Sequence, residues 1–99
     1  MARYVVELYR PSTGAETLRG AADRLADSAL ALTGEGTPVR YLDTIFLPGD
    51  ETCLHVFEAP CEADVRAVTE RAAVEADRVV LAEQIDPRPR QQTTKGDES

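Results

Sequence analysis

The residues best suited to chemistry lie close together, near position 53. Cys53 and His55 are separated by one residue, and His55 is the single histidine of the chain. In an extended strand, residues two apart point to the same side, with Cα atoms about 6 to 7 Å apart. A cysteine sulfur and an imidazole nitrogen are both ligands of divalent transition metals such as Ni, Co and Zn. The pair therefore predicts half of a metal site.

Carboxylates near this pair could supply the remaining ligands. Asp50 and Glu51 precede Cys53 in the turn before its strand, and Glu7 lies on a strand that we expect to run alongside. We therefore predict a site for Ni or another divalent transition metal, formed by Cys53, His55, Glu7, Asp50 and Glu51. The alternative is that His55 packs on the open face of a sheet and that Cys53 is a small apolar residue of the core.

A second cysteine, Cys61, follows Pro60 at the expected start of a helix. A thiol at a helix N-terminus can have a lowered pKa, which would make it a nucleophile or an oxidation sensor. The alternative is that Cys61 occupies a capping position where Ser, Thr, Asp or Asn is more usual. The sequence contains no GxSxG motif, and its Gly34-Glu35-Gly36 stretch lacks the lysine of a phosphate-binding loop, so these two classes of site are excluded.

The composition indicates one acidic globular domain. The chain has 99 residues, 11 basic and 18 acidic side chains and a formal charge of -7. An acidic surface repels phosphate backbones, so we expect no nucleic-acid partner. No apolar run approaches the roughly 20 residues of a membrane-spanning helix, and no signal-peptide pattern opens the sequence, so we expect no membrane association and a cytoplasmic location.

Hydrophobic periodicity and turn residues predict alternating strands and helices. Alternation of apolar and polar residues marks the strands, and apolar spacings of three and four residues mark the helices. The expected strands are 2–9, 39–47, 52–57 and 78–85, and the expected helices are 13–34 and 61–74. The order β-α-β-β-α-β closes as a four-stranded antiparallel sheet with two helices on one face, because each crossover is right-handed. The predicted fold class is therefore α+β, ferredoxin-like.

The composition changes after residue 86. Residues 1–86 carry the periodic apolar positions and form the predicted ferredoxin-like domain, whereas residues 87–99 have no apolar residue to bury and are predicted to be a disordered C-terminal tail. The tail holds three basic and two acidic residues, which leaves 8 basic and 16 acidic side chains for residues 1–86. The folded part of the chain is thus the acidic part.

Apolar residues are expected on both faces of this sheet. Val5 and Tyr9 lie on one side of the first strand, and we assign Phe57 of the third strand to the same, helix-free side. An exposed apolar sheet face is usually covered by a ligand or by a second copy of the chain. We therefore predict a homo-oligomer that associates through Val5, Tyr9 and Phe57.

Several segments resemble a known family of small actinobacterial domains of unknown function that are often described as nickel-binding proteins. The resemblance covers residues 2–86 and rests on the stretches DETCLHVFEAP (50–60), ADRVV (76–80), RYVVE (3–7) and VRYL (39–42). It implies a ferredoxin-like fold, an oligomer and, for some members, divalent metal binding.

The sequence also departs from this family. The members that resemble genuine metal binders carry histidines on the first helix and near the end of the second, where this chain has Ala21-Ala22-Asp23 and Arg71-Ala72-Ala73. Of the ligands that the resemblance implies, Cys53 carries over, and His55 is a possible local substitute.

Three functions remain open at this point. The first is divalent-metal binding or a response to metal, and the second is a non-enzymatic dimeric binding or interaction module. The third is a cofactor-free enzyme on a dimeric ferredoxin-like barrel, with His55 as general base and Tyr9 or Tyr41 as acid. The sequence favours a binding protein over an enzyme, because the enzyme hypothesis rests on fold analogy alone.

Overall fold

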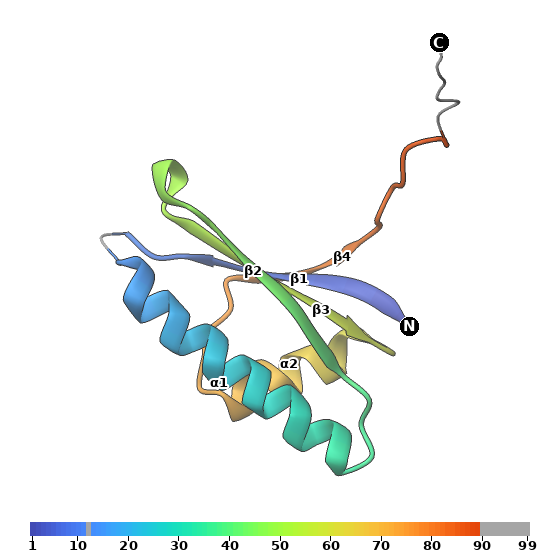
Figure 1. Cartoon of the computed structure of the whole chain (residues 1–99). Helices are drawn as coiled ribbons and strands as arrows, with labels where there is room; N and C mark the ends of the chain where they lie inside the picture. Colours follow the sequence, from blue (N-terminus) through green and yellow to red (C-terminus); the bar gives the residue numbers. More distant parts are fainter. Residues whose placement is uncertain (12, 90–99) are drawn as a thin grey trace.

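The computed structural model describes residues 1–11 and 13–89 (Figure 1). Within these residues the chain forms four strands, two α-helices and one short 3-10 helix. They are β1 (Ala2–Tyr9), α1 (Ala15–Gly34), β2 (Arg40–Leu47), the 3-10 helix η1 (Pro48–Asp50), β3 (Thr52–Ala59), α2 (Glu62–Arg71) and β4 (Arg78–Ala82). The predicted order of strands and helices is confirmed.

The four strands form one antiparallel sheet in the order β2-β3-β1-β4. Strands β1 and β3 are central, and β2 and β4 form the edges. Both helices lie on the same side of the sheet in Figure 1. The other side is referred to below as the helix-free face. This arrangement is the predicted α+β ferredoxin-like topology.

The core lies between the sheet and the two helices. Burial alternates along β1 and β3, so that every second side chain points toward the helices. Helix α1 buries Leu18, Leu25 and Ala29, and α2 buries Val65 and Val68, as their spacings predict. Burial of one such leucine or valine side chain stabilises a fold by about 1.5 to 3 kcal/mol. The helices are therefore held by their apolar stripes.

The helix ends differ from the predicted ones. Helix α1 begins at Ala15 rather than at residue 13, and its N-cap is Gly14, which has no side chain to form a capping bond. Helix α2 ends at Arg71 rather than at residue 74. The cause is Ala73, whose φ of 56° is left-handed and incompatible with a continuing right-handed helix.

The last strand and the segment after it also differ from the prediction. Strand β4 ends at Ala82 instead of residue 85, where its pairing with β1 ends opposite Arg3. Residues 87–89 of the predicted tail are exposed and lie outside helices and strands. The remainder of that predicted tail, 90–99, lies outside the described residues. In the part of the chain that the structure covers, no helix is long and apolar enough to span a membrane.

Candidate functional site

Strand β3 places Cys53 and His55 in the core, between the sheet and the helices. Every second residue from Cys53 to Ala59 is buried, and the exposed fractions are 1% for Cys53 and 0% for His55. The two side chains share one side of the strand, as their spacing predicts. The idea that His55 packs on the open face is wrong, because the intervening residues of β3 form that face. The companion idea, that Cys53 is a small buried residue, is confirmed.

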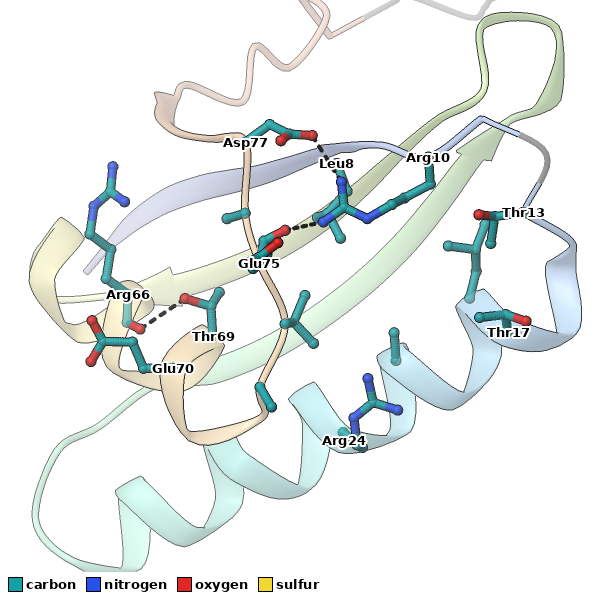
Figure 2. A pocket seen from close by; sticks show the side chains of 15 residues that line it. Leu8, Arg10, Thr13, Thr17, Arg24, Arg66, Thr69, Glu70, Glu75 and Asp77 are labelled. Carbon is teal, nitrogen blue, oxygen red and sulfur yellow. Dashed lines mark hydrogen bonds and ion pairs between the residues drawn. The ribbon is translucent and has the colours of Figure 1, made fainter.

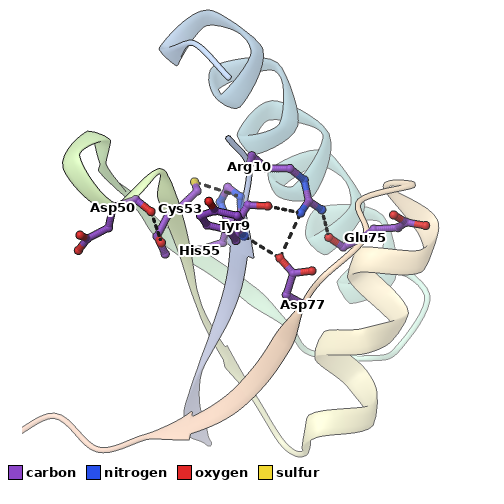
Figure 3. Close-up of polar contacts among 8 residues, drawn as sticks. Tyr9, Arg10, Asp50, Cys53, His55, Glu75 and Asp77 are labelled. Atoms are coloured by element: carbon purple, nitrogen blue, oxygen red, sulfur yellow. Dashed lines mark hydrogen bonds and ion pairs between the residues drawn. The ribbon is translucent and has the colours of Figure 1, made fainter. Parts of the chain in front are cut away.

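His55 is the centre of a chain of polar side chains. Its Nε2 lies 3.6 Å from Cys53 Sγ (Figure 3), and its Nδ1 lies 2.7 Å from Thr44 Oγ1. Thr44 Oγ1 makes a second hydrogen bond to the hydroxyl of Tyr41. The β2–β3 register creates this chain, since Thr44 lies opposite His55. Both ring nitrogens thus have a partner, which offsets most of the cost of burying the imidazole.

Burial keeps Cys53 and His55 neutral near pH 7. Desolvation lowers the pKa of His55 from its ordinary 6.5 to about 4, because apolar surroundings disfavour the imidazolium. Burial raises the pKa of the Cys53 thiol, and the nearby Arg10 charge offsets part of that rise. A thiolate–imidazolium pair, the activated form of cysteine nucleophiles, is therefore disfavoured.

The structure separates Glu7 from the Cys53–His55 pair. Strands β1 and β3 are neighbours, as expected, but Glu7 lies opposite Leu54 in their register. Its side chain consequently points to the helix-free face, where it forms an ion pair with Arg78 at 3.7 Å. Glu7 therefore lies on the wrong side of the sheet to complete a site with this pair.

The other two predicted carboxylate ligands lie at the β2–β3 connection. Asp50 is exposed at the end of η1, and Glu51 follows it in a left-handed conformation with φ of 51°. Over residues 1–11 and 13–89, no group of three or more His, Cys, Asp and Glu side chains is arranged to hold a metal ion. The predicted set of five ligands is therefore not assembled in the described structure.

The two tyrosines considered as acids lie on opposite sides of the sheet. Tyr9 is 57% exposed and alternates with the buried residues of β1, so it lies on the helix-free face. Tyr41 lies opposite Phe57 on the helix side and reaches His55 through Thr44. Only Tyr41 is thus connected to the histidine.

Cys61 occupies the N-cap of α2, as its sequence position predicts. It is exposed, and its side chain makes no capping hydrogen bond. Cys53 and Cys61 are both free cysteines. Whether Cys61 reacts as a nucleophile or oxidation sensor stays a prediction.

The helix-free face carries two of the three residues assigned to an oligomer interface. Val5 and Tyr9 point to this face, but the placement of Phe57 there is wrong. Phe57 is 0% exposed and lies opposite Tyr4, which is also part of the core. The residue of β3 that lies opposite Val5 is Val56. Val56 therefore takes the place that was predicted for Phe57.

The centre of the helix-free face is apolar. Val80, Val5 and Val56 lie side by side across β4, β1 and β3. Leu54 and Ile45 form a neighbouring pair on β3 and β2. Ile45 is 44% exposed, and the other four are partly buried in the single chain. No helix among residues 1–11 and 13–89 lies over this face in Figure 1, so these side chains keep part of their surface exposed in the described single chain.

Ion pairs lie beside the apolar centre of this face. The Glu58 carboxylate lies between two arginines, 3.4 Å from Arg3 and 3.0 Å from Arg40. The pair between Glu7 and Arg78 flanks the other side. Each of these glutamates is thus neutralised on the face itself, although the chain as a whole carries a charge of -7.

Arg10 joins the end of β1 to residues 72–77, which connect α2 to β4 and are called the link segment below. Its guanidinium donates to the carbonyl oxygens of Tyr9, at 2.8 Å, and of Glu75. It also forms an ion pair with Asp77 at 3.1 Å, and Asp77 accepts the Tyr9 amide at 2.6 Å (Figure 3). These bonds hold the link segment against β1.

An open groove with a volume of about 910 Å³ lies between α1 and the link segment (Figure 2). Thr17, Ala21 and Arg24 line it from α1, and Val74 and Glu75 are among the residues that line it from the link segment. This groove was not predicted from the sequence. The signal that could have found one wall is the spacing of four and three residues between Thr17, Ala21 and Arg24, which places them on one side of a helix. The other wall has no such pattern.

Comparisons with known proteins bear on the fold. The chain matches no protein-family profile and no curated protein. It is similar to the solved structure of SCO4226 from Streptomyces coelicolor A3(2), with a TM-score of 0.65 and 21% sequence identity. The alignment covers 86% of this chain and 100% of the other. The chain therefore shares its fold with SCO4226.

Proposed function

We propose that this protein is a non-enzymatic binding module that acts as a homodimer through its helix-free face. The observation that carries the proposal is the row formed by Val80, Val5 and Val56, which crosses three strands without a covering helix. Contiguous apolar surface on a soluble domain usually marks an interaction site. A second copy of the chain, bound over this row, also accounts for the ion pairs that lie beside it.

The charge distribution supports a second copy over an unrelated partner. Residues 1–86 carry a charge of -8, from 8 basic and 16 acidic side chains, so two copies repel each other over most approaches. On the helix-free face, Glu7 and Glu58 are paired with three arginines. Two identical faces related by a twofold axis can therefore meet with Glu7 and Glu58 already neutralised. Asp43, which lies opposite Val56 in the β2–β3 register, forms no ion pair with a described residue and is the carboxylate that such a contact has to accommodate.

A domain of this size also gains stability from association. A single chain of fewer than about 90 ordered residues buries only about 60 to 65% of the surface that its unfolded form exposes. Covering the half-buried Val5, Leu54 and Val56 adds apolar burial that two helices on the other side cannot provide. Dimerisation thus completes the core on its second side.

The test is the mass of the protein in solution, measured by light scattering or analytical ultracentrifugation. The parent should be a dimer, and Val56→Asp should be a folded monomer by circular dichroism. Leu30→Asp is the matched control, because Leu30 is 73% exposed on α1, away from the sheet. A parent that is monomeric at high-micromolar concentration, or a dimer broken by Leu30→Asp and kept by Val56→Asp, contradicts the proposal.

We propose divalent-metal binding by Cys53 and His55 as a second candidate function. The observation that favours it is the separation of 3.6 Å between Cys53 Sγ and His55 Nε2. Donors about 2.3 and 2.0 Å from one tetrahedral Zn²⁺ are separated by about this distance. Thr44 bonds the other ring nitrogen at 2.7 Å, and a hydrogen bond at the second ring nitrogen is what orients a metal-bound histidine. Further ligands would have to come from water or from outside the described residues.

Native mass spectrometry of the reduced protein with added Ni²⁺ or Zn²⁺ tests this second candidate. Binding of one ion per chain should be lost in Cys53→Ala and kept in Cys61→Ala, which removes the exposed cysteine of the described chain. Equal uptake by both variants, or no uptake by the parent, rules out a site at Cys53.

We propose a cytoplasmic location for this protein. Cys53 and Cys61 are both free, and free thiols persist in reducing compartments. Fractionation of cells that produce the native protein tests the location, and recovery outside the cytoplasm contradicts it.

A further inference from the structure

We propose that the groove between α1 and the link segment binds a small organic monocarboxylate with an apolar body, held through Arg24. The groove volume of about 910 Å³ falls within the roughly 300 to 1,000 Å³ of small-molecule sites. This inference assigns a ligand class to the proposed binding module and rests on that proposal. It uses a surface separate from the helix-free face, so the two can be tested independently.

Arg24 is the arginine of the groove whose charge is not neutralised. Arg10 and Arg66 also line the groove, and each is paired with a carboxylate. Arg24 forms no ion pair with any residue that the structure describes. Its positive charge is therefore available to an anionic ligand.

The side chain of Arg24 is held by the first residue of the link segment. Its Nε donates to the Ala72 carbonyl at 3.1 Å, and Figure 2 shows the guanidinium pointing from α1 into the groove. This bond uses one of the five N–H donors of the side chain. The two terminal amino groups retain the fork geometry that binds a carboxylate through two hydrogen bonds.

An apolar floor lies next to this cation. Leu18, Ala21 and Val74 line the groove and are 5%, 8% and 8% exposed. Thr17 precedes Ala21 by one helical turn and places a hydroxyl at the same wall. A ligand with a carboxylate at Arg24 can thus lay an alkyl or aromatic body over these side chains.

The remaining charges argue against a polyanionic ligand. Three arginines line the groove, and three carboxylates do so as well, those of Glu70, Glu75 and Asp77. Arg10 is paired with Asp77 inside the groove, and Arg66 is paired with Glu62 outside it. Arg24 is therefore the one unpaired cation among the lining residues, and the Glu70 and Glu75 carboxylates line the same groove without an ion pair to a described residue. Phosphate or a dicarboxylate would meet repulsion from the carboxylates, whereas a single carboxylate balances Arg24.

The experiment is a titration of the full chain, followed by NMR of the backbone amides, with octanoate, 1-octanol and inorganic phosphate as probes. Octanoate should give saturable chemical-shift changes at residues 17–24 and 72–76. Its Kd should be lower than the Kd of 1-octanol or of phosphate. Arg24→Gln should raise the octanoate Kd about tenfold, the equivalent of about 1.4 kcal/mol, and Arg24→Lys should retain part of the affinity. Arg19→Gln is the matched control on the same helix and should leave the Kd unchanged, because Arg19 is paired with Glu16.

Three results would overturn the inference. They are an octanoate Kd that Arg24→Gln leaves unchanged, phosphate binding tighter than octanoate, and no saturable shift in the groove up to about 10 mM octanoate. The Val56→Asp variant separates this proposal from the dimer. If this variant stays folded and keeps the groove shifts, the site stands whatever the oligomeric state. If it stays folded and loses them, the groove is not an independent site, and this too overturns the inference.

Discussion

The Thr44 hydroxyl lies 2.7 Å from His55 Nδ1, and this hydrogen bond joins an edge strand to a histidine that is 0% exposed. Together with the 3.6 Å contact to Cys53 Sγ, it gives each ring nitrogen a partner. Two proton arrangements satisfy this chain: either Thr44 donates to Nδ1 and Nε2 donates to Cys53, or Nδ1 donates to Thr44 and the thiol donates to Nε2. Both keep the imidazole neutral.

Removing the Thr44 hydroxyl should destabilise the fold measurably. Thr44→Val keeps the shape of the side chain but leaves a buried ring nitrogen without a partner, which costs about 1 to 3 kcal/mol. Urea unfolding measures this loss. The matched control is Thr52→Val on the neighbouring strand, whose hydroxyl bonds an exposed turn carbonyl at 3.0 Å and should cost less. Equal losses for the two variants would show that the His55 hydrogen bond contributes no more than the exposed bond of Thr52.

Stability should fall between pH 8 and pH 5.5 because of His55. Its pKa is about 4 in the folded chain and 6.5 as the ordinary value. The unfolded chain therefore binds the extra proton first, and the stability that is complete above pH 6.5 is lost as the pH falls toward 4. At pH 5.5 the loss is about 1.4 kcal/mol.

The control for this pH effect is His55→Gln, measured in the same denaturant series. The carboxylates titrate in both proteins, so the difference between the two pH profiles isolates the histidine. The parent should lose more stability than the variant as the pH falls. Parallel profiles would mean that His55 titrates normally in the folded protein.

Phe57 should contribute to the core and not to an interface. Phe57→Ala, made in the monomeric Val56→Asp background, should cost about 3 to 5 kcal/mol, because it removes a fully buried ring. Tyr9→Ala in the same background is the matched aromatic control and should cost less, since Tyr9 is 57% exposed. Chemical denaturation compares the two. A larger loss for Tyr9→Ala would place the core on the wrong side of the sheet.

Strands and helices could be predicted from this sequence because their signals are local. Strand β1 has the expected bounds, 2–9, since its alternation is nearly complete over eight residues. Alternation shows which residues share one side of a strand, but not which sides of two strands coincide. That depends on the β1–β3 register, in which Val5 lies opposite Val56. The misplacement of Phe57 and of Glu7 follows from this single missing fact.

The groove could not be predicted for a related reason. Its walls come from α1 and from the link segment, which has no periodic pattern. The position of the link segment depends on long-range bonds from Arg10 to Asp77 and to the Glu75 carbonyl. These bonds join residues more than sixty positions apart, so no local pattern in the sequence predicts them.

The left-handed conformation of Ala73 can be tested by replacing alanine with glycine at two nearby positions, where the change in stability should differ in sign. Its φ of 56° costs an alanine about 1 kcal/mol relative to glycine, which adopts this conformation without strain. Ala73→Gly should therefore stabilise the protein slightly or leave it unchanged, despite the larger entropy of the unfolded glycine chain. Ala67→Gly, inside α2, should destabilise it by about 1 kcal/mol, because glycine is a poor residue in a helix interior. Thermal and urea unfolding of both variants give the signs, and a loss at position 73 as large as that at 67 would show that α2 continues past Arg71.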